Sequence, residues 1–302
     1  MPELNFYTLP PYSLYTKKLV GNNTQEQDSA VLMVHGSAHT GHCYEYSPDG
    51  REGMGNYFVQ KGFDVYVVDW PGMGRSGFVP EEKINGSFFA YALANLIQSI
   101  NRKVIVICHS MSAPIVWKLP ELLDKNYISR IIALAPGEMG NIQEKAEYKT
   151  KTENVYEINF GPITYELEVP GFLPPSDEFV KRKLIGESKQ FPEDHLEDYK
   201  ATLQPTNTKL VWERFNVDGS QLKITNIEKF KEIKILTITG TNDADHPKEK
   251  DAEIVNYFTS RNIDCTHCFL GDFDIKGNGH MLMIEKNNYE IFNKILDWID
   301  KN

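Results

Sequence analysis

Three side chains that lie far apart in the sequence have the types needed for nucleophilic chemistry, and the first is a serine. Ser110 follows the apolar run Val104-Ile105-Val106-Ile107-Cys108 almost directly, and small residues, Cys108 and Ser112, stand two positions away on each side. A strand, a tight turn and a helix in this order lift a serine hydroxyl above the end of a parallel sheet. Cys108 and Ser112 occupy positions where glycine is usual, so the pattern is a variant of G-x-S-x-G. We predict that Ser110 is a nucleophile.

A serine hydroxyl is a weak nucleophile at neutral pH and needs an adjacent base. His280 lies in the glycine-rich stretch Gly277-Asn278-Gly279-His280, after the last expected strand, where a loop can present its imidazole over the edge of a sheet. The base in turn needs an acid that orients it. Asp243 stands three residues after Gly240, just past another expected strand, and is the predicted acid. Asp245 is a near neighbour that could substitute for it.

Two backbone N–H groups are needed to stabilise the negative oxygen that forms when a hydroxyl attacks a carbonyl. The residue after the nucleophile, Met111, would supply one of them. The second should come from the loop after an early strand, where His35-Gly36-Ser37-Ala38 stands. Ser37 is the predicted donor, and Ala38 is the alternative.

The elements that would position these residues are short apolar runs with the character of buried parallel strands. They cover residues 31–34, 65–68, 104–107, 131–134, 235–239 and 265–270. Helical stripes of apolar residues lie between or after them at 88–100, 248–261 and 289–299, and residues 7–12 and 14–20 predict an antiparallel hairpin at the edge. Alternating strands and helices predict an α/β fold with a mainly parallel sheet and helices on both faces.

The alternation stops between residues 140 and 229, where the sequence becomes polar. A hairpin is expected from 155–160 and 163–169, and Ser176 before two acidic residues predicts the start of a helix. About 90 residues are too many for a loop. We predict a core of residues 1–139 and 230–302 with an inserted cap, 140–229, over the site. Tyr165, Phe172 and Leu173 are candidate pocket residues, although they could equally form a small core of the cap.

Composition excludes several classes of function. The 302 residues are 41% hydrophobic and 25% charged, as in an ordinary soluble globular protein, and the net charge of −10 argues against binding nucleic acid or an anionic membrane. No apolar run approaches the length of a membrane span. The start lacks the features of a signal peptide, so a cytoplasmic protein is expected, although a secreted chain trimmed of its signal would look the same. The sequence carries no signal for an oligomeric state.

Two sequence patterns resemble a metal site and a dinucleotide site, but the elements expected around them argue against both sites. Cys265-Thr266-His267-Cys268 has CxxC spacing, but it lies in an expected strand, where residues three apart point to opposite faces. Gly72, Gly74 and Gly77 have G-x-G-x-x-G spacing, yet Phe78-Val79-Pro80 follows and no helix opens within the motif, as a dinucleotide site requires. We therefore predict no metal and no organic cofactor.

The motifs together resemble those of the α/β-hydrolase superfamily. His35-Gly36-Ser37, Asp69-Trp70-Pro71-Gly72-Met73-Gly74-Arg75-Ser76, the Ser110 turn, Gly240-Thr241-Asn242-Asp243 and Gly279-His280 occur in the order of that superfamily. The stretch Ser47-Pro48-Asp49-Gly50-Arg51-Glu52-Gly53 is also similar to a bacterial carboxylesterase subfamily. The resemblance implies an α/β-hydrolase fold and the catalytic triad Ser110, His280 and Asp243.

The subfamily resemblance raises a second candidate for the acid. There the acid can be a glutamate in a Glu-Pro-Gly sequence at the end of the strand after the nucleophile. The same place here reads Ala135-Pro136-Gly137-Glu138, so the aligned residue is Ala135, which cannot serve. Glu138, three residues later, is therefore the alternative acid.

These residues predict a serine hydrolase that cleaves a carboxylic ester through an acyl-enzyme, with a lactone or a thioester as the alternative substrate. A cap over an apolar pocket favours a small hydrophobic ester over a polymer. Two rival functions remain at this point. One is a ligand-binding relative that keeps the fold without turnover, because fold alone does not give function. The other is acyl transfer or lyase chemistry on the same triad.

Overall fold

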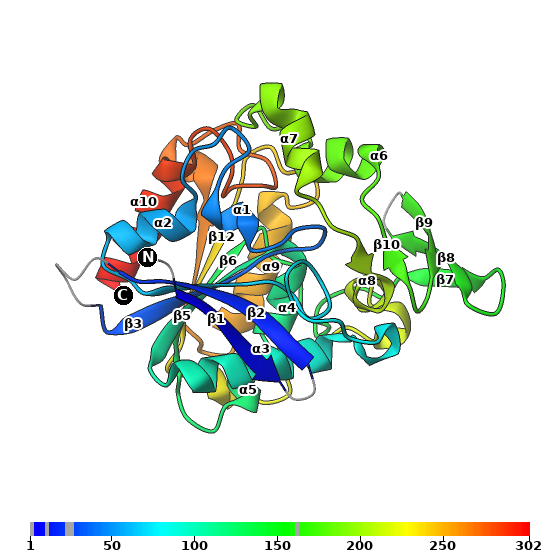
Figure 1. The fold of residues 1–302 in the computed structure, drawn as a ribbon, viewed down its shortest axis with the longest axis horizontal. Helices are drawn as coiled ribbons and strands as arrows, with labels where there is room; N and C mark the ends of the chain where they lie inside the picture. The colour runs from blue at the N-terminus through cyan, green and yellow to red at the C-terminus, as the bar shows by residue number, and fades with distance from the viewer. Residues whose placement is uncertain (1–2, 10–11, 22–26, 161–162) are drawn as a thin grey trace.

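The computed structural model describes residues 3–9, 12–21, 27–160 and 163–302, and its centre is an eight-stranded sheet (Figure 1). The strands run in the order β1-β2-β4-β3-β5-β6-β12-β13. Their bounds are β1 Glu3–Leu9, β2 Tyr12–Leu19, β3 Ser29–Val34, β4 Val65–Val68, β5 Lys103–His109, β6 Ile128–Leu134, β12 Lys234–Thr239 and β13 Cys265–Phe269. The six strands from β4 to β13 are parallel, whereas β2 pairs antiparallel with both β1 and β4.

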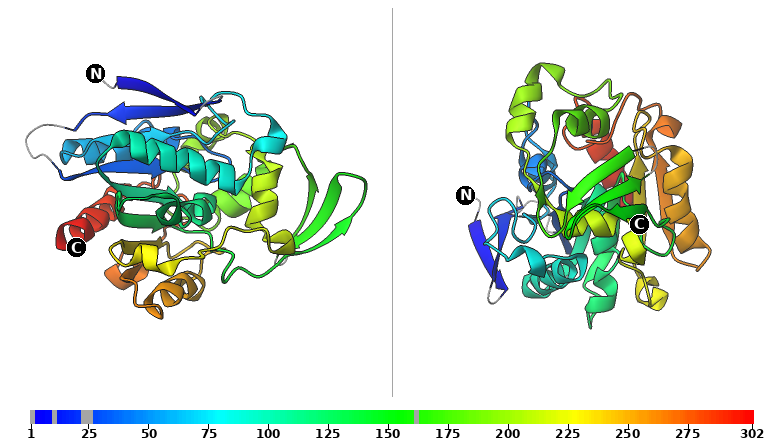
Figure 2. Two further views of the ribbon diagram at one scale, coloured as in Figure 1. Left: turned by 90° about the horizontal axis from the view of Figure 1, so that it is seen from below. Right: turned by 90° about the vertical axis from the view of Figure 1, so that its right-hand side faces the viewer.

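Helices cover both faces of this sheet (Figures 1 and 2). One apolar cluster joins the sheet to α3 (Gly86–Ile100), α4 (Ala113–Val116), α5 (Leu119–Leu122) and α9 (Lys248–Thr259). The cluster on the other face includes residues of α1 (His42–Glu45), α2 (Met54–Gln60) and α10 (Asn288–Lys301). Neighbouring residues of a strand point to opposite faces, so Val106 belongs to the first cluster and Ile107 to the second. The predicted fold class is thereby confirmed.

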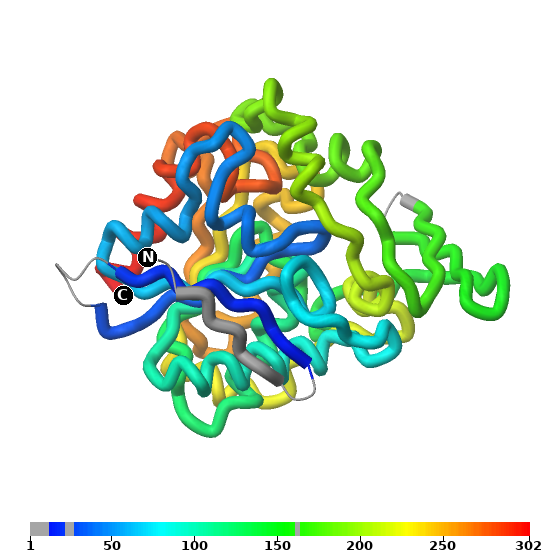
Figure 3. The backbone as a smooth tube through the Cα atoms, viewed as in Figure 1, coloured from blue at the N-terminus to red at the C-terminus, as the bar shows by residue number. Residues whose placement is uncertain are grey.

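The segment between β6 and β12 contains its own small elements. A three-stranded antiparallel sheet is formed by β7 (Glu147–Thr150), β8 (Val155–Phe160) and β9 (Ile163–Glu168), and a two-stranded one by β10 (Phe172–Leu173) and β11 (Thr206–Asn207). Its helical elements are α6 (Asp177–Phe179), the π-helical turn η3 (Val180–Ile185), η4 (Glu193–His195), α7 (Leu196–Ala201), α8 (Thr208–Arg214), η5 (Val217–Gly219) and η6 (Ile227–Phe230). The backbone tube shows this segment at the side of the molecule away from both termini (Figure 3).

The segment between β6 and β12 packs onto the eight-stranded sheet and the helices that cover it, through shared apolar clusters. Leu210, Val211 and Phe215 belong to the cluster of α3 and α9, while Leu184 and Tyr199 belong to the cluster of α2 and α10. Ser176 accepts the N–H of Phe179 and caps α6, as its position predicted. The turn of the expected hairpin, residues 161–162, lies outside the described residues.

Two of the remaining patterns can now be placed. Cys265 packs against the first apolar cluster and Cys268 is buried in the second, so their side chains do point to opposite faces of β13. The glycine motif after β4 forms turns, and the first helical element that follows is η1 (Glu81–Lys83). Among the described residues, no helix combines the length and the apolar character that crossing a membrane requires.

Candidate active site

Ser110 sits in a strained turn at the carboxyl end of β5. Its φ of 52° is rare for a residue with a side chain, and the turn η2 (Ser110–Ser112) leads directly into α4. Ser112, at a usual glycine position, uses its hydroxyl inside the turn: it accepts the N–H of His109 at 3.1 Å and lies 3.1 Å from the carbonyl oxygen of Val34. These hydrogen bonds stabilise the turn in which Ser110 adopts its strained backbone conformation, and this turn places the serine oxygen above the sheet.

The loop after β3 lies beside this turn because Val34 pairs with Cys108. The two chains approach so closely that a Cβ atom on Gly36 would lie 2.6 Å from Nδ1 of His109 and 3.1 Å from Cβ of Ser110. Only glycine fits such an approach. The register therefore brings the backbone of residues 36–38 next to the nucleophile candidate.

His280 is carried on a loop that is tied down from two sides. Arg51 donates hydrogen bonds to the carbonyl oxygens of Ile284, Glu285 and Lys286, each at 3.2 Å. The buried carboxylate of Glu285 accepts the N–H of Gly279 at 2.7 Å. The stretch that contains Arg51, chosen from the sequence only for its resemblance, thus anchors the loop of the base candidate.

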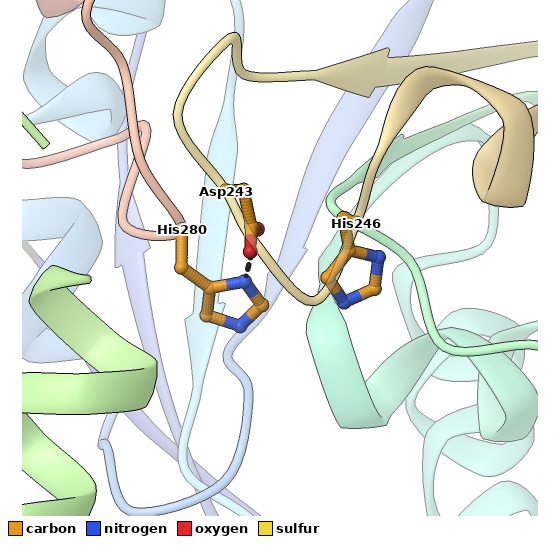
Figure 4. A group of neighbouring side chains, drawn as sticks. All are labelled: Asp243, His246 and His280. Carbon is orange, nitrogen blue, oxygen red and sulfur yellow. Dashed lines mark hydrogen bonds and ion pairs between the residues drawn. The ribbon is translucent and has the colours of Figure 1, made fainter. Parts of the chain in front are cut away.

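Ser110, His280 and Asp243 form one line of hydrogen bonds. Nε2 of His280 lies 2.9 Å from Oγ of Ser110, and Nδ1 lies 2.6 Å from Oδ2 of Asp243. Figure 4 shows the second contact, with the Asp243 carboxylate above the imidazole. A ring that donates from Nδ1 to a carboxylate keeps Nε2 free to accept the serine proton. The three residues that the sequence singled out are therefore in contact, although their catalytic roles stay predictions.

The electrostatics of the group keep the imidazole neutral. Burial lowers the pKa of His280 to about 4; Lys183 acts in the same direction and Asp243 in the opposite one. Burial alone would raise the pKa of Asp243, but His280 and Lys183 beside it hold that pKa well below its usual value. At neutral pH the site therefore contains an uncharged base hydrogen-bonded to an ionised acid, the combination that proton transfer from a serine requires.

The alternative acid, Glu138, has other partners. Its Oε2 lies 3.1 Å from Nη2 of Arg214 and its Oε1 lies 2.9 Å from Nζ of Lys250. These two cations outweigh the effect of burial and lower the pKa of Glu138 to about 2. Both carboxylate oxygens are thus engaged away from His280. Asp245, the other neighbour considered, pairs with Lys183 at 2.9 Å, so the hydrogen bond to the imidazole comes from Asp243.

Ser37 and Met111, the two residues predicted to supply the backbone N–H groups, lie at the same cavity. Both residues border the cavity beside Ser110, and among the described residues neither N–H donates a hydrogen bond. The alternative donor, Ala38, is engaged: its N–H donates to Oγ1 of Thr206 at 2.9 Å, and its carbonyl oxygen accepts the N–H of Gln204 at 2.9 Å. These contacts hold Ala38 at a φ of 60° and leave Ser37 as the available donor.

A cavity of about 390 Å³ opens at Ser110. The inserted segment supplies much of its apolar wall, namely Phe160, Tyr165, Leu173, Phe179, Leu184, Val211 and Phe215. Tyr165 and Leu173, two of the three candidate pocket residues, line this cavity. The third, Phe172, does not line it: its side chain is 41% exposed, and neighbouring residues of β10 point in opposite directions.

Sequence reasoning missed several residues of this wall. Charged side chains, Lys183, Arg214 and Lys250, line it beside the apolar ones, and so does His246. The His246 ring stacks on that of His280 with centroids 5.2 Å apart, and its Nδ1 donates to Asp251 at 2.9 Å. Lys250 and His246 lie near the predicted acid in the sequence, a signal that could have drawn attention to them, whereas nothing in the sequence around Arg214 points to a site.

The spacing of a metal site also occurs here: atoms that could bind a metal, one each from Asp243, His246 and His280, lie within 4.8 Å of one another (Figure 4). The hydrogen bonds account for this spacing, because Nδ1 of His280 bonds Asp243 and Nδ1 of His246 bonds Asp251. We therefore assign Asp243 and His280 to the line of hydrogen bonds that includes Ser110, with His246 stacked beside it.

The chain belongs to the alpha/beta hydrolase family, whose model matches residues 31–291. A curated relative is a probable secreted lipase, phiG, of Fungal sp. (strain ATCC 74256), 23% identical over 96% of this chain and 86% of the relative. Among solved structures, a monoacylglycerol lipase of Paleococcus ferrophilus is 18% identical with a TM-score of 0.63, covering 94% of this chain and 97% of its own. An esterase from Exiguobacterium antarcticum is 14% identical with a TM-score of 0.64, covering 99% and 100%. These likenesses in structure establish the fold.

Proposed function

We propose that the chain is a serine hydrolase that cleaves carboxylic esters of small, partly hydrophobic acids or alcohols. The observation that supports this function is the unbroken contact Ser110–His280–Asp243 at the mouth of a cavity. The relatives named as lipases and as an esterase point in the same direction. Lactones and thioesters present the same carbonyl to the nucleophile and remain alternative substrates.

The reaction begins when Oγ of Ser110 attacks the ester carbonyl carbon while Nε2 of His280 takes the hydroxyl proton. The tetrahedral oxyanion is stabilised by the N–H groups of Ser37 and Met111. It collapses when the alkoxide leaves with the proton from His280. A water molecule then gives a proton to Nε2 of His280 while its oxygen attacks the acyl carbonyl carbon. The second tetrahedral intermediate collapses when the bond to Oγ of Ser110 breaks and His280 returns the proton to that oxygen, which releases the carboxylic acid and restores the serine.

Asp243 stabilises the imidazolium that exists during both steps. The carboxylate is buried and lies 2.6 Å from the ring, so its charge is poorly screened by water. This electrostatic stabilisation acts only while the ring is charged. It therefore lowers the free energy of the transition states without lowering that of the bound substrate in the ground state.

The segment 140–229 acts in this proposal as a cap. It provides one wall of the cavity, and it holds the loop of the second oxyanion donor through Thr206 and through the hydrogen bond between Tyr199 and His39 at 2.7 Å. A cavity of about 390 Å³ suits a substrate of modest size rather than a polymer chain.

Replacing the nucleophile tests the proposal. We expect Ser110→Ala to reduce hydrolysis of 4-nitrophenyl butyrate by roughly a million-fold in kcat, as the removal of a catalytic serine does elsewhere. Ser99→Ala is a matched control, because Ser99 lies on α3 and does not line the cavity. A Ser110→Ala protein with the native rate would overturn the proposal, and a wild-type protein that turns over no ester would favour a ligand-binding role.

A further inference from the structure

We propose that the cavity contains an anion subsite, formed by Arg214 and Lys250, and that the preferred substrate is an ester carrying a carboxylate a few bonds from the ester carbonyl. The inference rests on the proposed function and names the substrate class of the same site. Its starting point is the charge of the cavity wall.

The wall has an excess of positive charge although the chain as a whole has a net charge of −10. The charged residues that line it, apart from the histidines, are Glu138, Lys183, Arg214, Asp245 and Lys250. Lys183 and Asp245 neutralise each other at 2.9 Å. Glu138 is shared between Arg214 and Lys250, so one carboxylate balances two cations. The cluster of Arg214, Lys250 and Glu138 therefore has one positive charge in excess, and this charge suits a monoanion.

Other acids lie close to the wall without lining it. Asp243 is hydrogen-bonded to His280, and Asp251 is hydrogen-bonded to His246. Oε2 of Glu253 lies 3.5 Å from Nζ of Lys250, but its side chain is 52% exposed and is not part of the wall. Water and salt screen such a charge. The Arg214 side chain is only 17% exposed, so its charge is the one that a bound substrate would sense most strongly.

The Arg214 guanidinium is held in place, and Arg214 lines the same cavity as Ser110. It stacks over the ring of Phe160 at 5.5 Å and donates to the side chain of Gln143. A Cβ atom on Gly137 would lie 3.2 Å from Nε of Arg214 and 3.3 Å from the carbonyl oxygen of Ser110. Nη1 of Arg214 bonds Gln143 and Nη2 bonds Glu138, so the charge of the guanidinium, close to the backbone of Ser110, is what would attract a carboxylate on a small substrate molecule.

The partner that Arg214 and Lys250 share in this structure is itself a carboxylate. Glu138 is a buried carboxylate that both cations contact, and a substrate carboxylate would compete with it or share the two cations. Opposite effects follow for two substitutions. Removing Arg214 lowers the preference for an anionic ester, whereas removing the charge of Glu138 raises it.

The experiment compares esters that differ only in charge. Monomethyl glutarate and methyl 5-methylhexanoate place the group on the acyl side, and 3-acetoxypropanoate and 3-methylbutyl acetate place it on the alcohol side. The readout is the ratio of kcat/KM for the anionic ester to that for its neutral partner, measured by acid release. We expect a ratio above one for at least one pair in the wild type.

Variants connect this ratio to the two cations. We expect Arg214→Met to lower the ratio about tenfold, which corresponds to about 1.4 kcal/mol, and Lys250→Met to lower it about threefold because this side chain is 38% exposed. Glu138→Gln should raise it. Lys248→Met is the matched control, because Lys248 lies on the same helix but pairs with Asp272 outside the cavity.

Two results would overturn the subsite: a wild-type ratio of one or less for both pairs, or a ratio that Arg214→Met and Lys248→Met change equally. Glu138→Gln keeps the test valid if Arg214→Met does not fold. Calorimetric binding of monomethyl glutarate to the Ser110→Ala protein separates the two proposals. Binding without any turnover by the wild type would contradict the proposed hydrolase function and support the subsite. Turnover of neutral esters without such binding would support the hydrolase function and contradict the subsite.

Discussion

Replacing Asp243 by asparagine removes one charge from the site and changes little else in shape. The asparagine amide can donate to Nδ1 of His280, which places the ring proton on Nε2. In that tautomer the imidazole cannot accept the proton of Ser110, although the two side chains lie 2.9 Å apart in the native protein. The variant therefore loses both the orientation of the base and the charge that stabilises its protonated form.

The magnitude follows from the burial of the pair. Both side chains are 2% exposed. Two unit charges about 4 Å apart attract each other by about 4 kcal/mol at an effective dielectric constant of about 20, which is roughly a thousandfold in rate. Loss of the correct tautomer adds to this, so we expect kcat to fall about ten-thousandfold.

The assay is hydrolysis of 4-nitrophenyl butyrate, with Asp245→Asn as the matched control. Asp245 lies two residues away and bonds Lys183 instead of the imidazole, so its substitution should cost less than about tenfold. Glu138→Gln belongs in the same series. The reasoning is refuted if Asp243→Asn keeps more than a tenth of the native kcat, or if Glu138→Gln causes the larger loss on this neutral ester.

Two further predictions concern the base and the oxyanion loop. Because His280 must be neutral to accept a proton and its pKa is about 4, kcat/KM should rise with pH through about 4 and be level near 6.5; a midpoint at 6.5 would contradict the buried, neutral imidazole. Thr206→Val removes the acceptor of the Ala38 N–H and should lower kcat about tenfold, whereas Thr206→Ser keeps the hydroxyl and should restore most of it. Equal rates for the two variants would show that this contact does not position the loop.

Much of the site could be predicted because its parts follow strands. Parallel strands share one carboxyl edge, and Ser110, Asp243 and the loop at Ser37 each come directly after an apolar run that proved to be β5, β12 or β3. His280 follows the last strand, so its loop could reach the same edge. Strand periodicity and the order of the motifs were sufficient to bring these residues together.

The cavity wall could not be predicted in the same way. Much of its apolar part belongs to the segment between β6 and β12, whose short elements have little periodicity. The orientation of these residues is decided by packing against the core. Phe172 and Leu173 are neighbours on a two-residue strand, and only packing decides which of them faces the cavity. The pairing of Glu138 with Arg214 joins residues 76 positions apart, a separation at which no local pattern carries information.

Covalent labelling with an alkyl fluorophosphonate tests the catalytic triad most directly, because phosphorus is attacked only by an activated nucleophile, with loss of fluoride. We expect one adduct per chain by intact mass, located on Ser110 by peptide mass spectrometry and formed in step with the loss of esterase activity. The Ser110→Ala protein should remain unlabelled, and Asp243→Asn should label much more slowly. Full esterase activity after prolonged treatment, or an adduct on another residue that tracks the loss of activity, would contradict the assignment.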